Sequence, residues 1–459
     1  MPWMFAVGIA AAALAAPQTY VLRAPINIWD QATEDFNGDG RQDIVLLCAD
    51  ERSDPLEKSA GVYIASEQGG YTEAPTYTIP LDSVSGAFFL AQVDGAGPRE
   101  IVAAHAEGAV VYRYSESAAS GFEKIASPQF DSLLPSSIRE PVFLRGSAQD
   151  LDGDGTDEWL VPMPNGYQIR HADHELSRVR CDVNSSISQE SNVFIRHRLP
   201  DAEPYGAADQ PLKGLAFLSD EYADFAYGPG WTEHWRFDIP LNLEDKWAAS
   251  ARMADVDQSG FPDLVVVQTR GSMNIEAITQ VYVADEAYKY PEKPTARFES
   301  KGAVEAPMLV DVDGDGDRDV LVISVPFGVK NLVNYFVRGK ISVDAVVYEF
   351  ANGKFSDKPV FTKSLTFEAP DGRERIAYEL ADFNGNGRLD LAFSSGGDKL
   401  VVHGGDPDDF LTRSPVYEVN VPSFGKAEAH DLRGDGSNDL VITHPGGKDN
   451  KRAEVILFN

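Results

Sequence analysis

The sequence predicts an all-β fold built from repeats. A nine-residue loop rich in Asp and Gly occurs six times along the 459 residues. Each copy leads directly into a short apolar run rich in β-branched residues, which is typical of a buried strand. The copies recur at spacings close to one or two multiples of about fifty to sixty residues, and such a period indicates a repeat architecture.

The clearest copy lies within 310–324, with the sequence V-D-V-D-G-D-G-D-R-D-V-L-V-I-S. Asp311, Asp313 and Asp315 occupy alternate positions, and Asp319 closes the loop. These carboxylates repel one another unless a cation lies between them. Because Ca²⁺ takes six to eight oxygen ligands at about 2.3–2.6 Å, we predict a calcium site. We number each loop from its first residue, so that Asp311 is position 1 and Asp319 is position 9. Positions 1, 3, 5 and 9 would bind the ion through their side chains, and position 7 through its backbone carbonyl.

This loop is not an EF-hand. The EF-hand needs a bidentate Glu at position 12 between two helices, whereas position 12 here is Val322, inside the predicted strand. We therefore expect the ion in a connection between two strands. The alternative is an ordinary acidic turn, because turns also favour Asp and Gly.

The other loops supply the remaining candidate ligands. The Asp431 loop carries Arg433 at position 3, which removes one ligand and adds a positive charge. We therefore expect about five Ca²⁺ ions and a weakened sixth site. The predicted ligands are Asp35, Asn37, Asp39, Arg41 and Asp43; Asp150, Asp152, Asp154, Thr156 and Glu158; Asp255, Asp257, Ser259, Phe261 and Asp263; Asp311, Asp313, Asp315, Asp317 and Asp319; Asp382, Asn384, Asn386, Arg388 and Asp390; and Asp431, Asp435 and Asp439.

The D-x-[DN]-x-[DN]-G-x-x-D loop followed by an apolar strand resembles the FG-GAP/VCBS-type repeat, which is also found in integrin α-chain propellers. The resemblance covers nearly the whole chain after about the first twenty residues. It implies a single β-propeller in which each repeat is one blade, with Ca²⁺ bound between the first two strands of a blade. It is specific for fold and calcium and says little about biological role.

Two degenerate repeats lie in the longer gaps between loops. Residues 92–100 keep the glycines, Asp94 and Glu100 and precede another apolar run, while 209–214 read as a loop trimmed to a plain turn. With both included, successive loops start 46 to 71 residues apart. This spacing favours eight four-stranded blades over seven, although seven stays open. We expect both degenerate loops to bind no metal.

A second recurring motif, a short strand-like run that ends in Pro, predicts how the ring closes. Residues 77–80, 235–240 and 417–422 each end in Pro ahead of a loop, as suits outer strands that need not donate every N–H. The same motif occurs near the N-terminus at 20–25. The last predicted strand of the sequence, 453–458, lacks this motif. We therefore predict that the N-terminal strand completes the last blade and removes an open edge.

The chain begins with an apolar stretch. Residues 1–15 are expected to be a secretory signal, because 4–15 are apolar and Ala-rich and 13–15 offer an A-x-A cleavage site. The usual basic residues before the apolar run are missing. We accordingly predict a propeller over 16–459 that is periplasmic or extracellular.

An insertion accounts for the longest spacing, 71 residues. Leu332, Val333, Phe336 and Val337 have helical spacing. We predict a short helix near 326–339 that either packs on its own blade or covers the channel mouth.

Composition limits the partners. Lys plus Arg total 40 and Asp plus Glu total 72, for a net charge of −32. This charge argues against nucleic acid and anionic membranes, which bind basic patches. No stretch reaches the roughly 20 apolar residues of a membrane span. Cys48 and Cys181 are expected to be buried free thiols, and the protein is expected to be monomeric.

No catalytic motif occurs in its structural context, and we predict no catalytic residues. His171 and His174 could suggest a metal pair, but we expect solvated loop residues. Trp231, Trp235 and Trp247 could stack on sugars, but we expect core aromatics. We predict a secreted calcium-binding propeller acting in non-catalytic binding, adhesion or scaffolding toward a protein or glycan. The alternatives are a polysaccharide lyase or hydrolase, by analogy with eight-bladed rhamnogalacturonan lyases, and a lectin.

Overall fold

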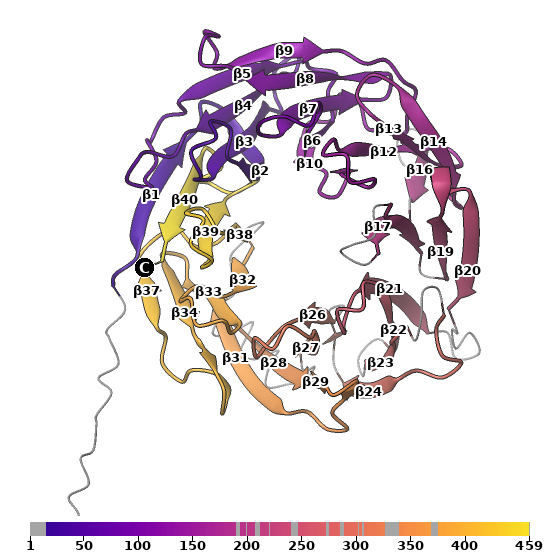
Figure 1. Cartoon of the computed structure of the whole chain (residues 1–459). Helices are drawn as coiled ribbons and strands as arrows, with labels where there is room; N and C mark the ends of the chain where they lie inside the picture. Colours follow the sequence, from indigo (N-terminus) through magenta and orange to yellow (C-terminus); the bar gives the residue numbers. More distant parts are fainter. Residues whose placement is uncertain are drawn as a thin grey trace, which may run out of the picture.

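The computed structural model describes residues 15–189, 193–198, 200–206, 212–219, 221–239, 247–271, 275–284, 289–301, 303–304, 307–325, 339–368 and 375–458. These residues form eight antiparallel blades arranged as a closed ring (Figure 1). The prediction of an all-β propeller with about eight four-stranded blades is confirmed, and the seven-bladed alternative is wrong.

The first four blades are formed by consecutive strands. Blade 1 contains β2 (Asn27–Glu34), β3 (Asp43–Asp50), β4 (Glu57–Tyr63) and β5 (Tyr77–Leu81). Blade 2 contains β6 (Ala87–Ala91), β7 (Glu100–His105), β8 (Gly108–Tyr114) and β9 (Phe122–Ala126). Blade 3 contains β11 (Ala148–Gln149), β12 (Glu158–Met163), β13 (Gly166–Arg170) and β14 (Glu175–Arg180). Blade 4 contains β17 (Asp201–Tyr205), β18 (Gly214–Leu218), β19 (Tyr222–Tyr227) and β20 (Glu233–Asp238).

The second half repeats this order. Blade 5 contains β21 (Ala248–Ala254), β22 (Asp263–Arg270), β23 (Glu276–Tyr282) and β24 (Ala296–Lys301). Blade 6 contains β25 (Ala303–Val304), β26 (Met308–Val310), β27 (Asp319–Val325), β28 (Lys340–Tyr348) and β31 (Phe361–Glu368). Blade 7 contains β32 (Tyr378–Ala381), β33 (Asp390–Gly396), β34 (Lys399–His403) and β37 (Tyr417–Val419). Blade 8 contains β38 (Lys426–His430), β39 (Asp439–Thr443), β40 (Arg452–Leu457) and β1 (Gln18–Arg23).

The second strand of a blade is deeply buried throughout the ring. β3 buries seven of its eight residues, and β39 buries all five. The apolar clusters run from one blade into the next, as where Leu46 of β3 packs in one core with Val441 of β39. A strand covered on both faces needs apolar residues on both, which explains why the sequence has continuous apolar runs after the loops.

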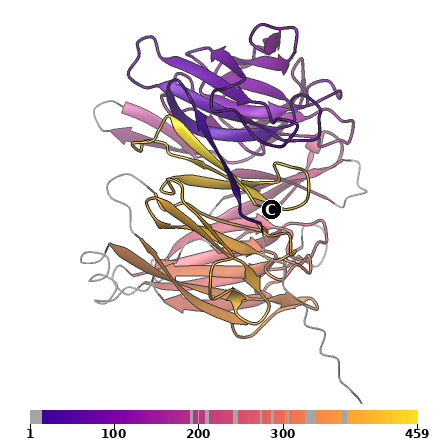
Figure 2. The ribbon, with the colours of Figure 1, turned by 90° about the vertical axis from the view of Figure 1, so that its left-hand side faces the viewer.

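The N-terminal strand closes the ring. β1 pairs antiparallel with β40, from Gln18 opposite Leu457 to Arg23 opposite Arg452. Figures 1 and 2 show this indigo strand beside the yellow C-terminal strands. The pairing joins the two ends of the chain and removes an exposed strand edge, as the sequence predicts. The outer strands predicted from Pro are also confirmed, since β5, β20 and β37 are each the fourth strand of a blade.

Short elements that the sequence did not indicate extend this plan. β10 (Val142–Phe143) pairs in parallel with the inner strand β6. The remaining additions are the pairs β15 (Asn184–Gln189) with β16 (Val193–Arg198), β29 (Phe350–Ala351) with β30 (Lys354–Phe355), and β35 (Gly405–Asp406) with β36 (Phe410–Leu411), and the 3₁₀ turn η1 (Pro229–Trp231).

Several expectations fall on residues whose structure is not described. These are residues 1–14 of the signal expected at 1–15, residues 209–211 of the trimmed loop, and residues 326–338 of the predicted helical insertion. Among the described residues, no helix is long and apolar enough to cross a membrane.

The cysteines and two of the tryptophans lie where the sequence places them. Cys48 and Cys181 are buried and unpaired. Trp231 is buried in the core between blades 3 and 4, where its Nε1 donates to the Lys213 carbonyl at 2.8 Å. Trp235 packs in an aromatic cluster with Phe225. The prediction that these two are core aromatics is confirmed.

Ring closure can be tested with Leu22→Ala. Leu22 of β1 is fully buried against the core of blades 8 and 1. Removing its side chain should lower the free energy of unfolding by about 2–5 kcal/mol, as other large-to-small core changes do. Thr19→Ala, at an exposed position of the same strand, is the matched control and should change it by less than about 0.5 kcal/mol. Equal effects in a urea titration would contradict the closure.

Candidate metal centres

Each acidic loop joins the first strand of a blade to the second, and the carboxylate at position 1 holds its turn. In the Asp311 loop, Asp311 accepts the amides of Gly314 and Gly316 at 2.7 and 3.0 Å. Gly316 has φ +98°, a conformation that L side chains rarely adopt. The other five acidic loops repeat the contact from position 1 to the amide of position 6, in Asp35–Gly40, Asp150–Gly155, Asp255–Gly260, Asp382–Gly387 and Asp431–Gly436.

Three loops bring carboxylates together as a metal site requires. In each of them, three side chains place one ligand oxygen apiece within 4.8 Å of the others. In two loops the carboxylates come from positions 1, 3 and 9, and in the third from positions 1, 3 and 5. The groups are Asp150, Asp152 and Glu158; Asp255, Asp257 and Asp263; and Asp311, Asp313 and Asp315.

Position 5 is turned toward the loop backbone. In the Asp35 loop, the Asp39 amide donates to both Asp35 and Asn37 at 3.0 Å, so oxygens of positions 1 and 3 converge on one hydrogen. The side chain of position 5 in turn accepts the amide of position 7. These pairs are Arg41 to Asp39, Thr156 to Asp154, Phe261 to Ser259, Asp317 to Asp315 and Arg388 to Asn386.

Position 9 has a second role that sequence reasoning missed. Asp43 is fully buried and accepts two amides, from Phe36 within the loop at 3.0 Å and from Ala65 beyond the third strand at 2.8 Å. It therefore ties the loop to the second and third strands. The same pair of contacts occurs at Asp263, Asp319 and Asp390, whose partners are Val256 and Ala284, Val312 and Phe350, and Phe383 and Gly405.

Where position 9 is Glu, a side chain takes the place of the distant amide. Glu158 accepts the Leu151 amide at 2.6 Å and contacts His171 Nε2 at 2.7 Å. Glu100 accepts the Val93 amide at 3.0 Å and Arg113 Nε at 2.6 Å. The expectation that His171 is a solvated loop residue is wrong, because it lies half-buried against this carboxylate.

Burial makes these carboxylates costly to ionise. Desolvation raises the pKa of Asp43, Asp263 and Asp319 to about 7, although the amide hydrogen bonds act in the opposite direction. The same cause raises the pKa of Asp390 and Asp439 to about 6. A cation in the loop would favour the ionised form, because opposite charge nearby stabilises a carboxylate.

Two loops with incomplete ligand sets contain a guanidinium. In the Asp431 loop, Arg433 lies 3.1 Å from both oxygens of Asp439 and 3.3 Å from Asp435. In the degenerate loop of blade 2, Arg113 Nη2 lies 2.8 Å from Asp94, and the same guanidinium binds Glu100. A fixed positive charge therefore lies against the carboxylates of positions 5 and 9 in one loop and 3 and 9 in the other.

The Asp35 and Asp382 loops differ in detail. Arg41 Nη2 donates to Asp39 of its own loop at 2.6 Å, and the hydrogen bonds of the buried Asp43 among the described residues come from two backbone amides. In the Asp382 loop, the Asn384 side-chain nitrogen donates to both oxygens of Asp390 at 2.9 and 2.8 Å. Rotating this amide would direct its oxygen into the loop instead.

Backbone hydrogen bonds join neighbouring loops around the ring. The residue before the second strand donates its amide to a loop carbonyl of the preceding blade, as Gln42 does to Leu432 at 3.0 Å. Five more such pairs are Asp157 to Gln92, Lys213 to Leu151, Arg318 to Val256, Leu389 to Val312 and Asn438 to Asp382. Blade 5 has Pro262 at this position, and the bond runs from Gly206 to Gly260 instead. In blade 2, Arg99 donates to the Glu34 side chain at 3.4 Å.

Comparisons with known proteins give low similarity. No protein-family model and no curated protein sequence matches the chain. Among solved structures, the biofilm matrix protein Bap1 of V. cholerae matches with 12% identity and a TM-score of 0.40, over 100% of this chain and 90% of its own. BBS1N in complex with ARL6DN matches with 10% identity and a TM-score of 0.39, over 98% of both chains. Sqt1 from Chaetomium thermophilum matches with 10% identity and a TM-score of 0.46, over 98% of this chain and 100% of its own. The FG-GAP/VCBS subtype stays a prediction.

The double contact of position 9 predicts a stability loss that does not depend on metal. Asp43→Ala leaves the buried Ala65 amide without its acceptor, at a cost of about 1–3 kcal/mol, and leaves the Phe36 amide with only its 3.1 Å contact to the Glu34 carbonyl. The free energy of unfolding, measured in urea with a chelator present, should fall by roughly this amount. Asp39→Ala, in the same loop but at exposed position 5, is the control and should cost less than about 1 kcal/mol under these conditions. A larger loss for Asp39→Ala would show that position 9 does not hold the blade.

Proposed function

We propose that this protein is a secreted, calcium-binding β-propeller that serves as a rigid, non-catalytic binding or scaffold protein. One observation carries the calcium assignment. The two loops whose ligand sets are incomplete each hold a guanidinium against their own carboxylates, from Arg433 and Arg113. The Asp150, Asp255 and Asp311 loops each keep three carboxylates clustered, and in the Asp150 loop Arg99 reaches only the neighbouring Asp157, at 3.3 Å, and His171 contacts Glu158. A bound cation would offset the negative charge of these carboxylates, as the guanidinium does in the other two loops.

The donor set favours calcium over other cations. All side-chain ligand atoms at the predicted positions are carboxylate, amide or hydroxyl oxygens, which suit hard cations. A loop that offers oxygens from positions 1, 3, 5 and 9 and one backbone carbonyl approaches the six to eight ligands of Ca²⁺. Mg²⁺ demands a near-ideal octahedron and gives up its water reluctantly, so it should fit the same loop less well.

The scaffold role rests on the connection between calcium and rigidity. Each loop positions the start of a buried second strand, and hydrogen bonds join the loops of neighbouring blades. An ion in each loop would therefore stiffen the ring as a whole. Secretion follows from the apolar N-terminal run and from the millimolar calcium outside cells, which suits loops that typically bind at about 10⁻⁴–10⁻³ M. The ligand would be a protein or a glycan, which a glycan array and a pull-down from envelope extract can identify.

Calcium content and thermal stability test the proposal. We expect about five Ca²⁺ ions per chain by elemental analysis after equilibrium dialysis against about 10 mM Ca²⁺, above the roughly 10⁻⁴–10⁻³ M range of such sites, with the calcium of the dialysate subtracted. Chelation should lower the melting temperature markedly, because one site at hundredfold ligand excess over Kd stabilises by about 2.7 kcal/mol. Calcium should restore the melting temperature and magnesium should restore it poorly.

Matched variants separate metal binding from general damage. Asp313→Ala should remove one ion and part of the calcium-induced stabilisation, whereas Asp94→Ala, in the loop already occupied by Arg113, should leave the calcium content unchanged. Two ions or fewer per chain, or melting curves that coincide with chelator and with millimolar Ca²⁺, would overturn the calcium assignment.

Arg433→Asp should create an additional calcium site. The substitution removes the guanidinium from Asp435 and Asp439 and supplies an oxygen ligand at position 3, so the loop regains the full acidic pattern. Calcium stoichiometry should rise by one ion per chain, and the variant should be less stable than the wild type in chelator because the carboxylates lose their counter-charge. Arg413→Asp, at an exposed arginine outside the loops, controls for the added negative charge. No gain in calcium for Arg433→Asp would show that the guanidinium does not stand in for an ion.

A further inference from the structure

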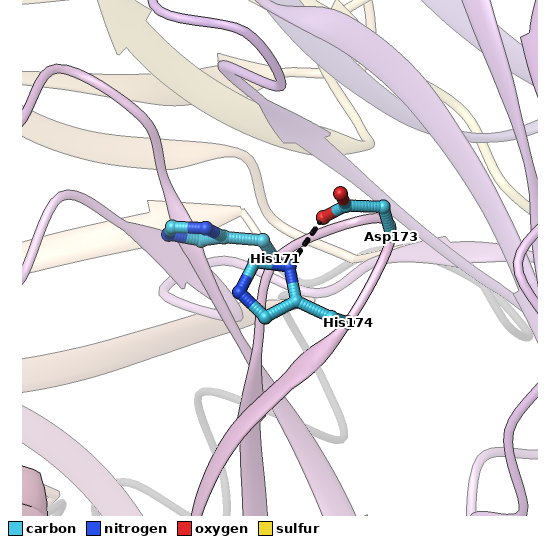
Figure 3. A group of neighbouring side chains, drawn as sticks. All are labelled: His171, Asp173 and His174. Carbon is cyan, nitrogen blue, oxygen red and sulfur yellow. Dashed lines mark hydrogen bonds and ion pairs between the residues drawn. The ribbon is translucent and has the colours of Figure 1, made fainter.

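A group of nitrogen and oxygen ligands lies outside the calcium loops, in the turn between β13 and β14 of blade 3. His171, Asp173 and His174 each place one ligand atom within 4.8 Å of the other two. The centroids of the two imidazole rings lie 5.3 Å apart, and the ring planes are nearly perpendicular, at 88°. Figure 3 shows all three side chains on this turn, with His174 Nδ1 2.7 Å from Asp173 Oδ1. The turn itself therefore assembles the group.

A buried carboxylate orients one of these histidines. Glu158 is fully buried, and its Oε1 lies 2.7 Å from Nε2 of His171. This contact occupies Nε2, so Nδ1 is the ring nitrogen that remains available for a metal. Histidines that bind metals almost always donate their second ring N–H to a carboxylate, a backbone carbonyl or water, which fixes the tautomer and the ring orientation. The contact with Glu158 thus gives His171 the support that a metal ligand needs.

The contact is specific to blade 3. In blades 1, 5, 6 and 7 the carboxylate at position 9 accepts a backbone amide from beyond the third strand, and in blade 2 it binds Arg113. Only blade 3, among the described residues, places an imidazole there. The third-strand turn of this blade therefore carries a ligand that its counterparts lack.

We propose that His171, Asp173 and His174 bind one divalent transition-metal ion, of the class of Zn²⁺, Cu²⁺ or Ni²⁺. Imidazole nitrogen suits these ions, whereas Ca²⁺ prefers oxygen. The site is accessible, because the side chains of His174 and Asp173 are 55% and 84% exposed. Three protein ligands leave coordination positions open to water or to a side chain of a binding partner. The three proposed ligands lie outside the calcium loops, although the Glu158 that contacts His171 is also a predicted calcium ligand of the Asp150 loop.

Zinc titration of the full chain tests the site. With millimolar Ca²⁺ present to compete at the carboxylate loops, isothermal titration with ZnCl₂ should give one tight site per chain. His174→Ala should weaken zinc binding by more than about tenfold, since loss of even a supporting partner typically costs about 10–100-fold in metal affinity. His234→Ala, at an exposed histidine of β20, is the matched control and should bind zinc as the wild type does.

Copper spectroscopy identifies the ligands directly. Electron paramagnetic resonance of the protein with one equivalent of Cu²⁺ should show two imidazole nitrogens in the wild type and one in His174→Ala. Asp173→Asn, at an exposed position, is a second variant that keeps the fold and should also weaken zinc binding. Unchanged zinc affinity in both variants, or a copper spectrum with oxygen ligands alone, would overturn the proposal.

Discussion

The buried carboxylate at the ninth loop position is the interaction on which this propeller depends. In seven blades it lies at the first residue of the second strand. It accepts an amide from its own loop in blades 1, 2, 3, 5, 6 and 7, and an amide from beyond the third strand in blades 1, 5, 6, 7 and 8. One side chain thereby fixes three segments of a blade. The amides it satisfies are buried, and a buried amide without an acceptor is costly. In the seven blades that have it, Asp or Glu at this position therefore stabilises the packing of the blade, whether or not a cation is bound.

Burying that carboxylate creates a charge problem, and the blades compensate for it in different ways. Desolvation raises the pKa of Asp43 and its counterparts, and the hydrogen bonds from backbone amides lower it by less. Blade 2 adds Arg113, blade 8 adds Arg433, and blade 3 adds His171. The Asp255 and Asp311 loops keep clustered carboxylates, for which a bound cation would serve the same purpose. The proposed calcium sites and the proposed transition-metal site are thus two consequences of one constraint.

The ring of hydrogen bonds between loops extends this constraint from a blade to the whole molecule. Because the amide before the second strand is bonded to the preceding loop in six of the eight described blades, a loop that loosens also weakens its neighbour. Loops that are ordered together can bind ions cooperatively, since an ordered neighbour lowers the entropy cost of ordering the next loop. The reversed bond at Pro262 keeps the connection where the usual donor is missing.

The sequence by itself determined the architecture, because that information is local and repeated. Each loop and its strand can be recognised within about fifteen residues, and the spacing of the loops indicated eight blades. The motif ending in Pro at 20–25 predicted that β1 completes blade 8. It also identified the oxygen-bearing positions of the loops. Only the tertiary structure decided how each loop is completed. Arg113 enters the loop of residues 92–100 from the third strand, and Glu158 meets His171 across the blade. Gln42 bonds to Leu432 across nearly the whole chain. A repeat pattern records which residues recur, but these contacts join residues that do not recur, and only folding brings them together.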